Sequence, residues 1–391
     1  MSYAGSLFID EGVLDINYIP SRLLHREAEL RTLRLMYDFM LTAPYEMSQR
    51  AIITGGVGSG KTALARVFGK WLTDEAKKRG VKARYIHVNC RELRGSLFMV
   101  LRRVVKQLRP EFPERGYAAH EIMEIIMQLL NDDKLQVLLC LDEVDSIINA
   151  EGSDPLYQLT RVHESMPDAP RRLSLLMISK DLDAFSKLDK STLSSLQRNV
   201  VALPDYSSPQ LADIVKARAE AAFRKGSMPL EVIDFIAELA SNERGDARYA
   251  IDLLWRAGKV AERSGVAQVK PEHVREVALS VFPSLKEDSL RQFSLHENLV
   301  LLAVARFFKQ SSQPYATTGE VENLYSVICE ERKEAPRSHT QFWKYMKSLE
   351  RLDFLKIKVE ASSHGRTQLV SLTKIKATDL EKEVLKTLGP G

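Results

Sequence analysis

The sequence has no uninterrupted run of about 20 apolar residues, the length that a membrane-spanning helix requires. One candidate, Leu299–Phe308, is broken by Arg306. The N-terminus carries Asp10 and Glu11 and lacks the basic residues followed by an apolar stretch that mark an export signal. These absences predict a cytoplasmic protein with no membrane partner.

Cysteine is scarce, because the 391 residues include only Cys90, Cys140 and Cys329, and their spacing matches no metal-binding pattern. The first two fall in or beside predicted strands, so we interpret them as small core residues in a reducing compartment.

Net charge is also low, at +4, and does not by itself indicate a nucleic-acid partner. A hydrophobic content of 45% and a charged content of 28% are typical of a soluble globular protein. The length predicts two or three domains.

A glycine-rich stretch, Gly55–Thr62, fits the pattern G-x-x-x-x-G-K-[ST] and follows a short apolar run, Ala51–Thr54. Strand, glycine loop and helix in this order predict a phosphate site, because glycines let backbone N–H groups wrap an anion and the helix adds its positive end. Lys61 would neutralise the β- and γ-phosphates of ATP or ADP, and the Thr62 hydroxyl would hold Mg²⁺. The predicted nucleotide-binding residues of the loop are Gly55, Gly56, Val57, Gly58, Ser59, Gly60, Lys61, Thr62 and Ala63. A glycine turn in an ordinary strand–helix unit is the alternative.

A second motif favours the nucleotide site. The continuous apolar run 136–141 predicts a strand buried on both faces, and Asp142 and Glu143 follow at its carboxyl end. Open α/β sheets bind their ligands at that end. Asp142 would complete the Mg²⁺ shell, and Glu143 would orient and deprotonate the attacking water. Together with Lys61, this pair predicts an ATP-binding protein.

Predicted strands and helices alternate from residue 45 to 205, which indicates a doubly wound parallel sheet. The strands are 50–54, 83–89, 136–141 and 173–178, and the helices are 61–79, 96–109, 120–131 and 155–164. Lys180 follows the last of these strands and would point toward the γ-phosphate. Arg26 lies in the lead-in Ile19–Glu27, and we expect this turn to pack on the nucleotide base. The predicted nucleotide-binding domain is 1–205, and its first 20 residues form an irregular arm.

Helical spacing replaces strands after Ser207, which predicts a helical lid over residues 206–287. Gly245–Leu254 begins one of its helices. Arg248, near the start of that helix, would reach the phosphates and join Lys61 and Glu143 as a catalytic residue. A solvated surface charge is the alternative for Arg248.

A hinge at Phe282–Ser289 leads into residues 288–391, where three helices and a hairpin predict a winged helix. The stretch Thr317–Glu320 is predicted to cap the second of these helices. From Arg337 to Lys376 there are nine lysines and arginines against three acidic residues. We therefore expect the third helix to enter the major groove of duplex DNA and the wing to reach the minor groove. The predicted contacts are Arg337, Lys344 and Lys347 on the third helix and Arg366 at the wing tip. A protein-binding winged helix with a solvated basic face is the alternative.

These motifs together resemble the AAA+ initiators of the archaeal origin-recognition family, which also includes eukaryotic origin-recognition and helicase-loader subunits. The resemblance covers nearly the whole chain and rests on Ile19–Glu27, both nucleotide motifs, Gly245–Ala250 and Gly365–Thr367. It implies an α/β P-loop AAA+ domain with a parallel sheet and a helical lid, followed by a winged-helix DNA-binding domain.

The resemblance also implies roles for single residues. Arg248 would be the sensor of the lid, and Gly365 would belong to the DNA-contacting wing. The basic stretch Arg91–Arg115 corresponds to a helical insertion that touches origin DNA in the family. Its implied DNA contacts are Arg102, Arg103 and Lys106.

Two positions depart from the family pattern. Lys180 stands where an asparagine sensor is usual, and Ser191 stands where an arginine is usual, although Lys190 or Arg198 could substitute for that arginine. Loss of an arginine finger costs on the order of 10³-fold or more in rate. We therefore expect a weak, slow ATPase, in which ATP acts mainly as a long-lived conformational ligand.

The leading hypothesis is an ATP-dependent initiator that recognises replication origins and helps recruit the replicative helicase. Paralogous initiators are further expected partners, and the nucleoid is its expected location. A nucleotide-responsive DNA-binding regulator without a helicase-loading role is the alternative. A clamp-loader subunit is disfavoured, because its Ser-Arg-Cys motif is missing here.

Overall fold

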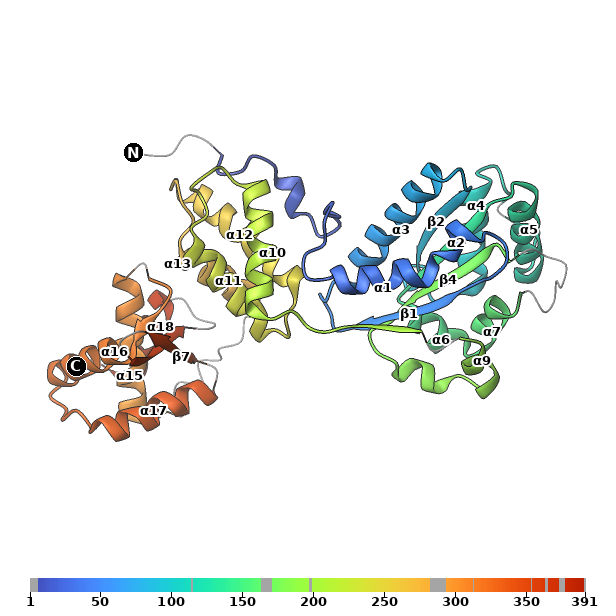
Figure 1. Ribbon diagram of the computed structural model, residues 1–391. Coiled ribbons are helices and arrows are strands. Elements are labelled where there is room, and N and C mark those ends of the chain that lie inside the picture. The colour runs from blue at the N-terminus through green and yellow to red at the C-terminus, as the bar shows by residue number, and fades with distance from the viewer. Residues whose placement is uncertain are drawn as a thin grey trace. The chain divides into compact units, whose positions relative to one another are not determined.

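A computed structural model describes residues 6–113, 115–162, 171–196, 199–281, 293–311, 313–352, 354–362, 365–372 and 377–389. The chain forms two compact units (Figure 1). The first unit comprises Ile19–Gln210 and Arg244–Ala247, and the second comprises Met1–Tyr18, Leu211–Glu243 and Arg248–Gly391. Among the described residues, no helix is long and apolar enough to cross a membrane.

Five parallel strands in the order β2-β3-β4-β1-β5 form the sheet of the first unit. They are β1 (Arg50–Gly55), β2 (Ala83–Asn89), β3 (Gln136–Asp142), β4 (Leu173–Ile178) and β5 (Val200–Leu203). The central strands β3 and β4 are buried along their whole length, as the apolar runs predict. The four predicted strands are confirmed to within one residue. β5, a strand of only four residues, was not predicted.

Helices cover both faces of this sheet (Figure 1). On one face lie α1 (Glu27–Tyr37), α2 (Phe39–Thr42) and α3 (Lys61–Lys78). On the other lie α4 (Leu97–Leu108), α5 (Ala119–Asp132), α6 (Asp145–Glu151) and α7 (Asp154–Thr160). The short helices η2 (Asp183–Lys187) and α9 (Lys190–Ser195) lead from β4 to β5.

The second unit begins with a helical lid. Its helices are α10 (Ser208–Ala222), α11 (Leu230–Asn242), α12 (Ala247–Arg263) and α13 (Pro271–Val281). The N-terminal arm, which includes η1 (Glu11–Leu14), packs against these helices: Leu7 is fully buried, and the Phe8 ring lies 4.5 Å from the Phe223 ring. Arg218 also donates to the carbonyl of Val13. The sequence does not reveal this docking, because the arm has no periodic pattern.

A winged helix completes the second unit. It contains α15 (Leu295–Gln310), β6 (Ala316–Thr317), α16 (Thr318–Glu331), α17 (His339–Arg351), β7 (Leu355–Ser362), β8 (Gly365–Leu372) and α18 (Ala377–Leu388). Its sheet has the order β6-β8-β7. The predicted cap of the second helix is confirmed, because Thr317 and Glu320 form a reciprocal capping box. The predicted AAA+ domain, lid and winged helix are therefore confirmed, while the hinge predicted at Phe282–Ser289 lies outside the described residues.

Candidate nucleotide and nucleic-acid sites

The glycine loop runs from the end of β1 to the start of α3, as predicted. Gly58 and Gly60 have φ angles of +72° and +92°, which L side chains rarely adopt. A Cβ atom on Gly60 would lie 2.9 Å from the Tyr206 hydroxyl, and one on Gly58 would lie 1.9 Å from Oδ1 of Asp246. Both positions therefore require glycine for conformation and for space. The loop is the kind of narrow, N–H-lined turn into which phosphate groups fit.

Arg26 holds this loop from the inside of the protein. Its side chain is 1% exposed, and its Nε and Nη2 atoms donate to the Ser59 carbonyl at 3.1 and 3.0 Å. Nη2 also donates to the Pro204 carbonyl at 2.6 Å, and the guanidinium stacks 3.9 Å from the centre of the Tyr206 ring. Arg26 thus fixes the backbone of the loop. The expected packing of the lead-in turn on the base stays a prediction.

The two predicted magnesium ligands come into contact. The Thr62 hydroxyl, in the first turn of α3, donates to Oδ2 of Asp142 at 2.8 Å. Lys61 Nζ donates to the carbonyls of Gly55 and Gly56, both at 2.7 Å, so its ammonium lies over the loop. The glycine loop and the end of β3 therefore form one site, as the spacing of the two motifs predicts.

His87 is a contact of Asp142 that was not predicted. Its Nε2 lies 3.1 Å from Asp142 Oδ2. Burial raises the pKa of the Asp142 carboxyl, but hydrogen bonds from His87 and Thr62 outweigh burial, and the net shift is below the ordinary value of 3.8. Asp142 is thus an ionised oxygen ligand, which suits Mg²⁺. Only the pairing of β2 with β3 places His87 here, and that strand order is not readable from the sequence.

Glu143, the predicted catalytic base, has a φ of +52°, in the left-handed region that non-glycine residues avoid. Its carbonyl accepts bonds from the Ser146 N–H at 3.0 Å and the Ser146 hydroxyl at 2.7 Å, which hold the turn. Its carboxylate is 43% exposed and lies 3.9 Å from the guanidinium of Arg91. The predicted base is therefore an accessible carboxylate, and its partner comes from the basic stretch that begins at Arg91.

The remaining predicted phosphate contacts lie at loops and at a helix start. Lys180 follows β4 with an exposed side chain, and its carbonyl accepts from the Gly55 N–H at 3.1 Å. Ala247 N–H lies 3.4 Å from the Gly58 carbonyl. Arg248 is the next residue of α12 but belongs to the second unit, so its approach to the phosphates stays a prediction, as does that of Lys180.

Ser191 has an arginine beside it in space although not in sequence. Its hydroxyl accepts from Nη2 of Arg161, at the end of α7, at 2.8 Å. Lys190 begins α9, and Arg198 lies outside the described residues. The expectation of slow hydrolysis, drawn from the missing arginine, stays a prediction.

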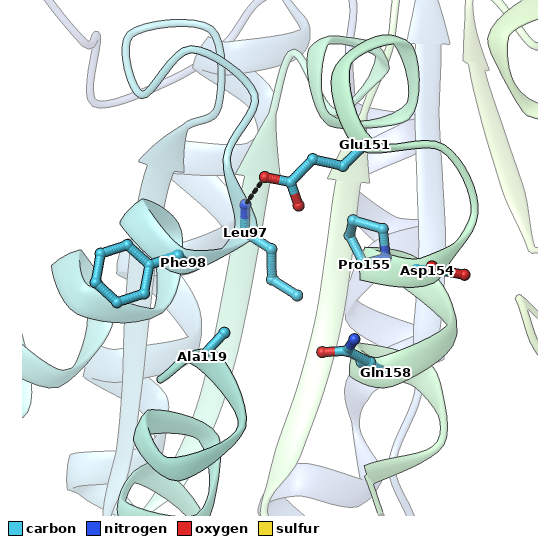
Figure 2. Close-up of a pocket in the computed structure, with 7 residues that line it drawn as sticks. All are labelled: Leu97, Phe98, Ala119, Glu151, Asp154, Pro155 and Gln158. Atoms are coloured by element: carbon cyan, nitrogen blue, oxygen red, sulfur yellow. Dashed lines mark hydrogen bonds between the residues drawn. The ribbon is translucent and has the colours of Figure 1, made fainter. Parts of the chain in front are cut away.

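The basic residues of α4 lie on its polar side. Apolar residues of this helix are buried in the core, whereas Arg103 is exposed and Arg102 and Lys106 are half-buried. A cavity of about 430 Å³ opens at the start of α4 (Figure 2), where the Leu97 N–H donates to Glu151. Its lining includes the carboxylates Glu151 and Asp154, which disfavour a phosphate backbone. The predicted DNA contacts of α4 do not line this cavity.

The predicted DNA contacts of the winged helix lie at three places. Lys344 and Lys347 are exposed on α17, and Lys347 pairs with Glu350 at 2.8 Å. Arg337 was expected on the same helix, but α17 begins at His339, so Arg337 lies in the connection before it. The reason is that Ser338 is the N-cap of α17, so Arg337 precedes the first helical residue. Gly365 and Arg366 begin β8 opposite the end of β7, close to the hairpin turn as predicted.

Comparisons with known proteins match three family models. The model described as an AAA domain matches residues 48–182, the Cdc6 AAA+ ATPase-type lid domain matches residues 212–278, and the CDC6 C-terminal winged helix domain matches residues 288–382. The ORC1-type DNA replication protein 2 of Sulfurisphaera tokodaii is 30% identical over 376 residues, which cover 94% of this chain and 90% of that protein.

Solved structures match over the same length. Cdc6p from Pyrobaculum aerophilum is 28% identical with a TM-score of 0.87, over 98% of this chain and 99% of that one. The Aeropyrum pernix ORC1 protein, solved in complex with DNA, is 30% identical with a TM-score of 0.63 over 96% of each chain. The Aeropyrum pernix ORC2 protein, solved as ADPNP-ADP complexes, is 27% identical with a TM-score of 0.65 over 98% of each.

Proposed function

The chain belongs to the family of ORC1-type DNA replication proteins, and we propose that it is an ATP-dependent initiator that binds origin DNA and helps recruit the replicative helicase. The resemblance expected from its motifs is confirmed. The single observation that carries the proposal is the bond between Thr62 and Asp142, which joins the glycine loop to the end of β3. The glycine loop and the end of β3 together make a nucleotide site, and the same chain contains a winged helix.

The nucleotide site fits ATP or ADP through its own residues. The loop Gly55–Ala63 presents its N–H groups, Lys61 supplies a cation, and Thr62 with Asp142 offers two oxygens to Mg²⁺. When bound, Mg²⁺ offsets the negative charge that develops on the phosphates. The nucleotide complexes of the Aeropyrum ORC2 protein support this assignment.

Hydrolysis in this site depends on Glu143, whose exposed carboxylate orients an attacking water and accepts its proton. We include Arg248 among the catalytic residues because the stretch Gly245–Ala250 resembles the lid sensor motif of the family. Turnover is slow, because Ser191 and Lys180 replace the groups that speed hydrolysis in relatives. Nucleotide therefore serves mainly to set the position of the lid, which acts as the link to DNA.

The proposed DNA contacts of the winged helix are Arg337, the exposed lysines of α17, and Gly365 and Arg366 of the hairpin. A separate set of proposed contacts lies on the polar side of α4. The complex of the Aeropyrum ORC1 protein with DNA supports DNA binding by this chain. The exposed cations Arg103, Lys344 and Lys347 suit contacts with phosphate oxygens, which give affinity and a steep dependence on salt.

Protection mapping on genomic DNA with ATP and with ADP tests the proposal. We expect a small set of protected sites with ATP, weaker protection with ADP, and loss of the difference in Lys61→Ala, which removes the cation from the phosphates. Arg248→Ala should bind nucleotide yet lose most of the same difference. Uniform binding along the genome, with no effect of nucleotide, would overturn the proposal.

Recruitment of the helicase separates an initiator from a regulator. The purified replicative helicase of the same organism is added to the chain bound on a protected duplex, and its retention is measured with ATP. An initiator retains the helicase, and Lys61→Ala does not. A chain that protects specific sites but retains no helicase is a DNA-binding regulator.

A further inference from the structure

A buried histidine holds Arg337 in place. His296, on α15, is 6% exposed, and its Nε2 accepts a hydrogen bond from Nε of Arg337 at 2.9 Å. Its Nδ1 lies 2.8 Å from the Tyr325 hydroxyl on α16. The imidazole also stacks on the Tyr345 ring of α17, with 9° between the two planes. Three helices of the winged helix thus fix the position of this one ring.

The chemistry of these groups fixes the protonation of His296. A guanidinium only donates hydrogen bonds, so Nε2 of His296 must be the unprotonated acceptor. The hydrogen of the neutral ring therefore lies on Nδ1 and is donated to Tyr325. Burial, and then the charge of Arg337, lower the pKa of His296 below its ordinary value of 6.5, which favours this neutral form.

Tyr325 fixes the backbone of the same arginine. Its hydroxyl oxygen also accepts from the Arg337 N–H at 3.2 Å. Burial raises the pKa of Tyr325 to about 12, so it stays a neutral phenol. Arg337 is therefore held at its backbone by Tyr325 and at its side chain by His296.

Arg337 is nevertheless exposed. Within the described part of the chain, its Nη1 and Nη2 atoms have no hydrogen-bond partner, since its side chain is bound only at Nε. Two terminal N–H groups on a fixed guanidinium are suited to a bidentate contact with phosphate oxygens. Arg337 also immediately precedes Ser338, the N-cap of the 13-residue helix α17, whose N-terminal end favours the same anion.

We propose that His296 and Tyr325 are positioning residues for DNA binding, which orient Arg337 toward a phosphate of duplex DNA at the N-terminus of α17. This inference rests on the proposed function. A free arginine loses much side-chain entropy when it binds, whereas an arginine that is already held loses little. The network thus gives affinity without itself touching DNA.

The test uses the full-length chain and a fluorescein-labelled duplex of mixed sequence, with affinity measured by anisotropy over a series of salt concentrations. We expect Arg337→Ala to weaken binding about tenfold and to reduce the slope of log affinity against log salt by about 0.9, because one phosphate contact is lost. His296→Phe keeps the ring stacking but removes the acceptor. It should weaken binding roughly fivefold with an unchanged slope, because the charge is still present.

The double variant His296→Phe/Arg337→Ala shows whether His296 acts through Arg337. We expect it to bind no more weakly than Arg337→Ala alone, because the two residues form one unit. His296→Gln, which returns an acceptor, should restore much of the affinity. His273→Phe, a matched change in the lid, should have no effect on DNA affinity. Arg337→Lys changes an exposed residue and should not affect folding. Its DNA affinity and salt dependence should match those of His296→Phe.

The outcomes separate this inference from the proposed function. A wild-type chain that does not bind the duplex at low salt overturns the proposed DNA-binding function itself. If the wild-type chain binds, two results overturn the positioning role alone. One is that His296→Phe binds DNA as tightly as wild type. The other is that His296→Phe lowers DNA affinity as much in the Arg337→Ala chain as in the wild-type chain. If His296→Phe does not fold, Arg337→Lys replaces it in the test, and wild-type affinity in that variant overturns the positioning role.

Discussion

Two buried arginines, one in each compact unit, use the same chemistry for different purposes. Arg26 is 1% exposed and Arg275 is 2% exposed. Each guanidinium lies against an aromatic ring and pairs with a carboxylate three residues away in the sequence. Nη1 of Arg26 lies 3.6 Å from the Glu29 carboxylate, and Nη1 of Arg275 lies 3.1 Å from the Glu272 carboxylate. Each donates to backbone carbonyls far away in the sequence. A buried guanidinium is costly unless it is well bonded, so each must be compensated by these contacts.

Hydrogen bonds dominate the compensation of Arg26. All three of its nitrogens donate to carbonyls, those of Ser59, Pro204 and His25. No other side chain supplies three nitrogen donors in one plane. The geometry of the glycine loop therefore depends on an arginine at position 26.

Arg275 is compensated in part by packing. Its Nη2 donates to the carbonyls of Gln313 and Pro314, which lead into the winged helix, but its Nε has no hydrogen-bond partner among the described residues. Its guanidinium lies 5.2 Å from the Phe235 ring and 4.4 Å from the Phe308 ring. At Arg275, the lid therefore contacts the winged helix partly through apolar packing, whereas the glycine loop is held at Arg26 by directed hydrogen bonds.

The largest expected effect is that of Arg26→Met. An apolar side chain leaves the carbonyls of Ser59 and Pro204 without donors, so the first unit should lose about 3–4 kcal/mol of unfolding free energy. ATP affinity should also fall, because the loop is no longer held. We expect scanning calorimetry to show one transition for each unit, and isothermal titration measures ATP binding. Unchanged ATP affinity in a folded Arg26→Met chain would contradict the assigned role.

Arg275→Met should be milder, because a long apolar side chain can fill the space between Phe235 and Phe308. We expect a loss below about 1 kcal/mol in the second unit, since apolar replacement of a buried charge is often nearly neutral. Arg275→Ala leaves a cavity and should cost about 2–3 kcal/mol. The comparison fails if Met costs as much as Ala at Arg275, or if Met is neutral at Arg26.

The two arginines also mark the limit of prediction from sequence. The strands of the first unit, its two nucleotide motifs and the Thr317 cap follow from local patterns, because each depends on residues close together in the chain. Arg26 was expected only in a turn near the nucleotide base, and Arg275 looks like an ordinary surface charge in the sequence. Their roles depend on partners such as Pro204, 178 residues from Arg26, which only the folded chain brings near.

The same limit applies to the functional sites. Thr62 and Asp142 were paired by motif, since a glycine loop and an apolar strand with an acidic end have a fixed relation in parallel sheets. His87 and His296 were not found, because a single histidine carries no periodic signal. Arg337 was assigned to the third helix, but Ser338 is the N-cap of α17 and leaves Arg337 outside it.

A smaller effect should come from Glu238→Gln, at a second contact between lid and winged helix. The Glu238 carboxylate accepts from the Tyr315 hydroxyl and pairs with Lys358 at 3.3 Å. Lys358 is 40% exposed, so solvent weakens the pair, and we expect a loss of about 0.5–1 kcal/mol in the second unit. The calorimetric transition of the first unit should not move. A larger loss than that of Arg275→Ala would show that polar contacts, rather than packing, join lid and winged helix.

The smallest expected effect is a difference in acid sensitivity between the two units. In the second unit, burial lowers the pKa of His296 and of His273 below 6.5. The folded unit then binds fewer protons than the unfolded chain, so its stability is fully present above about pH 6.5 and is lost as pH falls through the lowered pKa values. The charge of Arg337 lowers the pKa of His296 further, whereas the charge of Glu334 raises it.

In the first unit the pKa of Asp142 is also lowered, but from 3.8, so its contribution is lost only as pH falls through values below 3.8. Between about pH 7.5 and pH 5, calorimetry should therefore show the transition of the second unit moving to lower temperature ahead of that of the first. The double variant His273→Gln/His296→Gln, which does not titrate there, should flatten this dependence, whereas Asp142→Asn should not. If the transition of the first unit moves first in this range, groups other than these histidines set the acid sensitivity, and the two units do not differ as their buried side chains indicate.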